Sequence, residues 1–172
     1  MIRFAYQRNN AVAYARRWGK SRNPAYYDFS ELGGDCTNFI SQCVFAGSGV
    51  MNDTPVYGWY YHNLNDRSAS WTGVEYFYNF MVSNQGVGPV MEEVSLEELQ
   101  PGDVIQLGRS DGSFYHTMLV TETGERPTFS NTLITTHSYD AYNRPLDSYD
   151  AKVMRFLHVR YVNISREMIL RA

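Results

Sequence analysis

The hydrophobic period of the chain changes near Gln85-Gly86, and this change constrains the fold more than any other feature of the sequence. Upstream, apolar residues recur at i, i+3, i+4 and i+7, whereas the downstream segments are short and in part alternating. The upstream spacing predicts helices over residues 4–18, 35–47 and 73–83. The downstream pattern predicts strands over residues 104–107, 114–121, 132–136 and 153–162. Helices followed by an antiparallel sheet indicate the α+β class.

Length and composition narrow the possibilities further. The 172 residues, 44% of them hydrophobic, fit one domain spanning 1–172 that can bury a core without disulfides. A net charge of −3 without a basic run gives no electrostatic support for nucleic-acid binding. No apolar stretch is long enough to span a membrane, and we expect no secretion signal behind Met1-Ile2-Arg3. Cytoplasmic location and export by another route both stay open, as does the oligomeric state.

Cys36 occupies the start of the second predicted helix. Gly33 and Gly34 permit a tight turn before it, and Asp35 is a good N-cap because its carboxylate can accept amide hydrogens of the first turn. The other cysteine, Cys43, lies seven residues further along the same helix. At 1.5 Å per residue the two are about 10 Å apart, too far for a disulfide, so we expect both thiols to be free.

A cysteine at a helix N-terminus is a candidate nucleophile. The free amide hydrogens and the helix dipole favour the thiolate there, and the backbone amide of Cys36 can stabilise an oxyanion. Asp35 opposes the thiolate electrostatically, so a histidine base must supply much of the activation. We expect alkylation of Cys36 well below the free-thiol pKa of about 8.5, dependent on that histidine.

His116 is the candidate base, because it lies near the start of a predicted strand and can face a cleft there. If the next strand pairs with it antiparallel, His137 at that strand's end lies beside His116. A third group in this position would orient the base through its other ring nitrogen. His137 is favoured by this geometry, and Asp140 and Asn131 are the competitors.

Residues 6–47 resemble the bacterial putative amidase domain, a family related to papain-like peptidases and to the CHAP-type cell-wall amidases. The most specific match is Gly33-Gly34-Asp35-Cys36-Thr37-Asn38-Phe39-Ile40-Ser41-Gln42. Other matches fall in the expected order along nearly the whole chain: Tyr6-x-Arg8-x-x-Ala11-Val12-x-Tyr14-Ala15, Asn23-Pro24-x-Tyr26, Trp59-Tyr60-Tyr61, Ser70-Trp71, Gly102-Asp103-Val104-Ile105, His116 and Thr136-His137-Ser138. The hairpin between His116 and His137 is longer than in the compact cell-wall peptidases of this superfamily.

The resemblance implies a papain-like fold in which helices carry the nucleophile and pack on a small antiparallel sheet or barrel that carries the histidine. It also implies hydrolysis of amide bonds, often in cell-wall (peptidoglycan) peptides, through a thioester on cysteine and without a cofactor or metal. Aromatic residues clustered in loops are candidates to line the substrate groove, although plain packing explains them equally well. The candidate substrate-binding residues are Tyr27, Trp59, Tyr60 and Trp71, together with Asp35 and Tyr115 beside the proposed nucleophile and base.

Three alternatives remain at this point. Cys36, His116 and His137 are all possible zinc ligands, although no paired zinc-binding spacing supports them. The chain could instead be a non-catalytic module that binds glycan or peptide through its aromatic loops. Within the enzyme class, the acyl group on cysteine could pass to an amine rather than to water.

Overall fold

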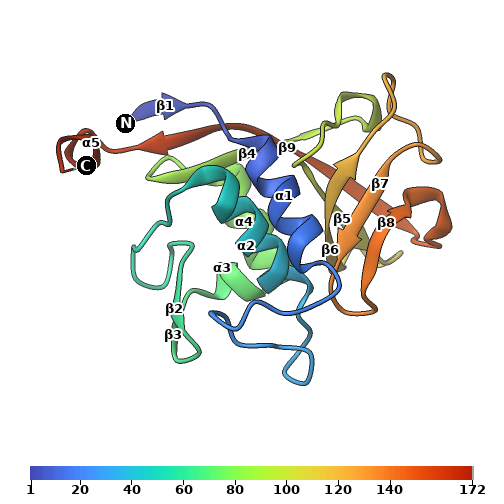
Figure 1. Ribbon diagram of the computed structural model, residues 1–172, viewed down its shortest axis with the longest axis horizontal. Helices are drawn as coiled ribbons and strands as arrows, with labels where there is room; N and C mark the ends of the chain where they lie inside the picture. The colour runs from blue at the N-terminus through green and yellow to red at the C-terminus, as the bar shows by residue number, and fades with distance from the viewer. Residues whose placement is uncertain (172) are drawn as a thin grey trace.

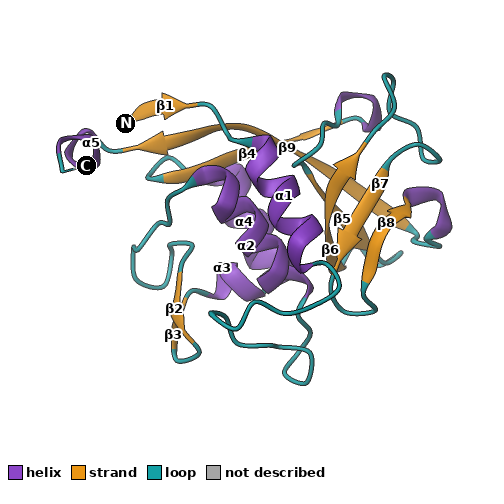
Figure 2. Cartoon of the chain, in the orientation of Figure 1, coloured by secondary structure: helices purple, strands orange, loops and turns teal. Residues whose placement is uncertain are grey.

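The computed structural model describes residues 1–171 and has a mixed α+β architecture in which helices pack beside an antiparallel sheet (Figures 1 and 2). The helices are α1 (Arg8–Trp18), α2 (Cys36–Ser48), α3 (Ala69–Thr72), α4 (Val74–Ser83) and α5 (Arg166–Leu170). The strands are β1 (Ile2–Phe4), β2 (Tyr61–Asn63), β3 (Asp66–Arg67), β4 (Gly88–Val94), β5 (Val104–Gly108), β6 (Phe114–Glu122), β7 (Leu133–Thr136), β8 (Ala141–Pro145) and β9 (Val153–Ile164).

The main sheet is organised around the long strand β9. One edge of β9 pairs with β4, and the other edge pairs with β5 and then with β1. Beyond β5 the sheet continues through β6, β7 and β8, and every pairing is antiparallel. The antiparallel pairing of β6 and β7, which the expected position of His137 assumed, is present, with Leu119 opposite Thr135.

The two faces of this sheet bury different clusters. Helices α1, α2 and α4 cover one face, where Phe39, Trp71 and Leu119 belong to the larger core (Figure 2). Met118, Ile105 and Ile134 point to the opposite face and form a second cluster. Neighbouring residues of β6 therefore serve opposite faces, as the two-residue period of a strand requires.

Most of the predicted elements are present, with differences at segments whose partners are distant in sequence. The first helix begins at Arg8 rather than at residue 4, because Ile2–Phe4 pair with Ile164, Asn163 and Val162 of β9. Strands β4 and β8 were not predicted, since Pro89 and the pair Glu92-Glu93 interrupt the apolar pattern of β4 and polar residues dominate β8. None of the described helices has the length and apolar character needed to cross a membrane.

Candidate active site

Cys36 is the first residue of α2, as the sequence predicts. Gly33 and Gly34 reach it with φ angles of 85° and 100°, a left-handed backbone that glycine adopts without strain. Within the described residues, no carbonyl accepts the backbone N–H of Cys36, which is one of the free donors of a helix N-terminus. Cys36 and Cys43 are both free thiols, which confirms the predicted absence of a disulfide.

His116 lies on β6 and pairs with Leu107 of β5. By the two-residue period of the strand, it shares the sheet face of Met118. Its Nε2 lies 3.4 Å from the hydroxyl of Thr136, a long contact.

Hydrogen bonds fix the nucleophile's helix against the strand of the histidine. The hydroxyl of Thr37 lies 2.9 Å from the hydroxyl of Thr117, so the residues that directly follow Cys36 and His116 are joined. Gln106 Nε2 donates to the Thr117 hydroxyl at 3.2 Å. All three side chains are buried, and the start of α2 is therefore held in a defined position relative to β6.

Cys36 and His116 line one pocket, of about 340 Å³. This volume lies within the usual range for small-molecule sites. The remaining described lining residues are Gly33, Gly34, Leu107, Tyr115, Ser138, Tyr139, Arg144 and Tyr149. A larger hollow of about 710 Å³ beside α1 has neither cysteine nor histidine among its described lining residues, so the smaller pocket is the candidate site.

Burial favours the neutral forms of both candidate catalytic groups. It lowers the pKa of His116 from 6.5 to about 4. Burial also raises the pKa of the Cys36 thiol, and hydrogen bonds from the Thr117 backbone and from Thr37 oppose this only in part. The pKa of the Cys36 thiol is therefore shifted upward, opposite to the direction expected from the sequence, because desolvation outweighs these hydrogen bonds.

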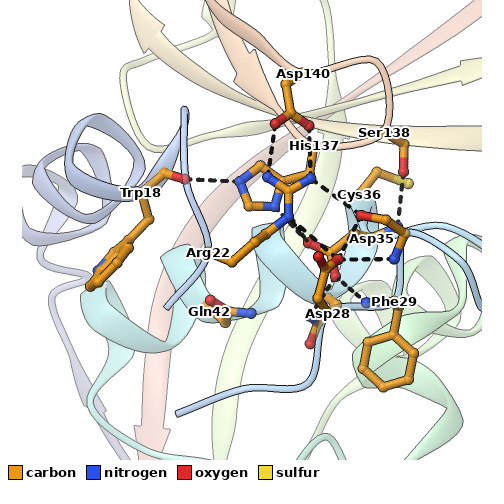
Figure 3. A network of polar contacts seen from close by, with 12 residues as sticks. Trp18, Arg22, Asp28, Phe29, Asp35, Cys36, Gln42, His137, Ser138 and Asp140 are labelled. Carbon is orange, nitrogen blue, oxygen red and sulfur yellow. Dashed lines mark hydrogen bonds and ion pairs between the residues drawn. The ribbon is translucent and has the colours of Figure 1, made fainter. Parts of the chain in front are cut away.

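Asp35 occupies the predicted position but contacts different groups from those expected. Its carboxylate makes no capping bond to α2. Instead, Oδ1 accepts from the Phe29 backbone and from Asn38 Nδ2, both at 2.9 Å. The side chain is only 1% exposed, and it anchors the loop that precedes Cys36 (Figure 3).

His137 does not stand beside His116. Its Nδ1 lies 2.6 Å from Asp35 Oδ2, and its Nε2 lies 2.9 Å from the Trp18 carbonyl (Figure 3). Its ring also stacks on Phe39. The prediction of a side-by-side pair is corrected by the strand register. Because Leu119 pairs with Thr135, continuing the register places His137 opposite Thr117, and His116 faces the other side of the sheet.

The two competing third residues are also engaged elsewhere. Asp140 makes an ion pair with Arg22, at 2.8 Å from Nη1. Asn131 accepts from the Thr128 backbone at 2.7 Å and donates to the Arg126 carbonyl at 3.0 Å. Among the described residues, no hydrogen bond joins His116 to His137, Asp140 or Asn131.

The aromatic residues proposed for a substrate groove separate into two groups. Trp59 and Trp71 are fully buried in the larger core, where their indole nitrogens donate to Ser41 and Asn38. Tyr27 and Tyr60 lie outside the pocket lining, and Tyr115 belongs to it. The groove prediction is therefore wrong for the two tryptophans, whose apolar surface packs against α2 and α4.

Several pocket residues were missed by sequence reasoning. Ser138 accepts a hydrogen bond from the backbone N–H of Asp35 at 2.8 Å, and Tyr139 follows it in the same left-handed turn. Arg144 and Tyr149 come from β8 and the turn after it. The motif Thr136-His137-Ser138 was a signal for Ser138, but nothing in the sequence pattern indicated that β8 reaches this pocket.

The described residues contain no group of three or more His, Cys, Asp or Glu side chains arranged to hold a metal ion. Cys36, His116 and His137 therefore do not form the zinc site considered as an alternative, because His137 lies on the other face of the sheet.

Comparisons with known proteins agree with the family-level resemblance. The family model described as "Putative amidase domain" matches residues 5–159. The uncharacterized protein YhbB of Bacillus subtilis (strain 168) is 40% identical over 146 residues, which cover 82% of this chain and 44% of YhbB. The chain thus spans less than half the length of this relative. No solved structure matches the chain significantly.

Proposed function

Because the chain belongs to the putative amidase domain family, we propose that it is a cysteine-dependent amidohydrolase with a papain-like arrangement of its catalytic groups. The observation that supports this most strongly is that Cys36, at the N-terminus of α2, and His116, on β6, line one pocket. The hydroxyl contact between Thr37 and Thr117 keeps these two elements together.

The reaction starts from a neutral pair. As the Cys36 sulfur attacks the amide carbonyl carbon, His116 takes the thiol proton, so a stable thiolate is not required beforehand. In this proposal the free backbone N–H of Cys36 donates to the oxyanion of the tetrahedral intermediate. Collapse breaks the C–N bond, and His116 returns the proton to the departing amine.

The second half regenerates the thiol. His116 removes a proton from water, which attacks the thioester and releases a carboxylic acid while the proton returns to the Cys36 sulfur. If an amine attacked the thioester in place of water, the product would be a new amide. An acyl transferase would therefore form the same thioester on Cys36. Cell-wall peptide amides are the substrate class that we propose on the basis of the family.

Asp35 and His137 have a supporting role in this proposal. Both residues touch the loop or helix that positions Cys36, and neither contacts the imidazole of His116. Among the described residues, the hydroxyl of Thr136 is the side-chain group within hydrogen-bonding distance of that imidazole, 3.4 Å from Nε2.

Turnover of short cell-wall peptides, with acyl-enzyme detection by mass spectrometry, tests the proposal. We expect a thioester adduct on Cys36 in the wild type and a loss of at least about 10³-fold in turnover for Cys36→Ala and His116→Ala. Cys43→Ala is the matched control, because Cys43 lies buried on the same helix, and it should retain turnover. Undiminished hydrolysis by Cys36→Ala would disprove the proposal. Peptide binding by Cys36→Ser without turnover by the wild type would instead indicate a binding module.

A further inference from the structure

The pocket around Cys36 has an unbalanced positive charge. Arg144 is the one permanently charged side chain among its described lining residues, and none of them is an Asp or Glu. Two acids next to lining residues are engaged elsewhere, since Asp140 pairs with Arg22 and Asp35 accepts from buried donors. A cation that forms no ion pair with a described carboxylate leaves an attractive field for an anion inside the pocket.

The guanidinium of Arg144 is held in place. Its Nε donates to the Ser148 hydroxyl at 2.7 Å, and its Nη2 donates to the Ser148 carbonyl at 3.0 Å. Its carbon atom Cζ lies 4.1 Å from the centre of the Tyr149 ring. Within the described residues, no carboxylate forms an ion pair with Arg144 and no acceptor contacts its Nη1. A guanidinium fixed on one side and free on the other suits a planar anion such as a carboxylate.

A second polar group in the pocket wall also lacks a partner. The hydroxyl of Tyr149 is buried without a hydrogen-bond partner of good geometry among the described residues. Burial raises its pKa, and the neighbouring Arg144 guanidinium opposes this larger effect only in part. A buried hydroxyl without a well-placed partner has an energetic cost. Arg144 and Tyr149 come from adjacent segments and line the same pocket as the nucleophile.

We propose that Arg144 makes this pocket selective for amides that carry a carboxylate close to the scissile bond, with Tyr149 beside it in the anion-binding wall. This inference rests on the proposed function, since it names the substrate class of the same site. The carboxylate binds the free edge of the guanidinium, and the amide carbonyl then lies at Cys36. An amide of the same shape with a neutral carboxamide lacks this contact.

Alkylation of Cys36 by iodoacetate and by iodoacetamide tests the inference without a substrate. The two reagents carry the same iodomethyl group and differ in having a carboxylate or a carboxamide. The rate at Cys36 is followed by mass spectrometry, and the measured quantity is the ratio of the iodoacetate rate to the iodoacetamide rate. We expect Arg144→Gln to lower this ratio about 3–10-fold and high salt to lower it in the wild type.

Two further variants control for other effects. Arg144→Lys keeps the charge and should retain most of the ratio. Arg109→Gln is the control for charge near the pocket, because the Arg109 guanidinium packs over Tyr115 but Arg109 is not among the described lining residues. This variant should leave the ratio of the iodoacetate rate to the iodoacetamide rate unchanged. The iodoacetamide rate in Arg144→Gln shows whether the pocket is still formed.

The possible outcomes separate this inference from the proposed function. An unchanged ratio in Arg144→Gln, an equal fall in Arg109→Gln, or failure of both reagents to reach Cys36 would overturn the role of Arg144. If Cys36-dependent hydrolysis is observed with an unchanged ratio, the function stands and the selectivity fails. If no hydrolysis is found but the ratio depends on Arg144, the anion site stands and the amidase proposal fails.

Discussion

Oδ2 of Asp35 lies 2.6 Å from Nδ1 of His137, and both side chains are almost completely buried. This contact joins the residue that precedes the candidate nucleophile to the end of β7. The other ring nitrogen of His137 faces the Trp18 carbonyl at the end of α1. One histidine thus connects the loop before α2 with the end of α1 and the end of β7. These contacts fix the backbone that leads into Cys36.

Removing the Asp35 carboxylate should destabilise the fold. Asp35→Ala leaves the Phe29 N–H, Asn38 Nδ2 and His137 Nδ1 without their acceptor in a buried place. We expect the free energy of unfolding, measured in urea, to fall by about 2–5 kcal/mol. Arg22 Nε lies 3.5 Å from Asp35 Oδ2 and also pairs with Asp28 near the surface. Asp28→Asn is therefore the matched control, and it should cost less than about 1 kcal/mol. Equal losses in the two variants would contradict this role.

The burial of His116 predicts a specific dependence of stability on pH. Its pKa is about 4 in the folded chain, against about 6.5 when exposed. The unfolded state therefore takes up the proton first as the pH falls, and stability is lost between about pH 6.5 and pH 4. At about pH 4.5 the loss should be roughly 2–3 kcal/mol. Urea unfolding at neutral and acid pH should show a smaller loss in His116→Gln, and an identical loss would contradict the buried neutral imidazole.

The two cysteines should both titrate above the ordinary thiol range. Burial raises the pKa of Cys36, and it raises that of Cys43 much further. In iodoacetamide alkylation followed over pH, we expect a midpoint for Cys36 above about 8.5 and a still slower reaction of Cys43. A midpoint below about 7 at Cys36 would instead indicate a preformed thiolate–imidazolium pair with His116.

Trp59 and Trp71 should matter for stability rather than for substrate binding. Both are 0% exposed, and their rings lie 4.8 Å apart between centroids. Replacement of either by alanine should lower the free energy of unfolding by about 3–5 kcal/mol, because it opens a cavity in the core. The change can be measured in urea, with Tyr57→Ala as a control on a residue that is 83% exposed. A near-neutral effect at either tryptophan would show that the side chain is not packed as described.

The sequence by itself determined the features that depend on local spacing. Apolar periodicity predicted α2, α4 and the strands β5, β6, β7 and β9 close to their observed bounds, and the glycines before Asp35 predicted the turn into α2 at Cys36. The antiparallel pairing of β6 and β7 also followed from their order. These features arise from interactions among residues that are near one another in the chain.

Only the tertiary structure decided which face each side chain serves. The direction of His137, opposite to that of His116, depends on a register that a shift of one residue would reverse. The pairing of β1 and β4 with β9, and the approach of Arg144 and Tyr149 to Cys36, depend on contacts between segments far apart in sequence. The neutral state favoured for the thiol and the imidazole has the same origin. Desolvation is a property of the packed surroundings, which no local pattern in the sequence specifies.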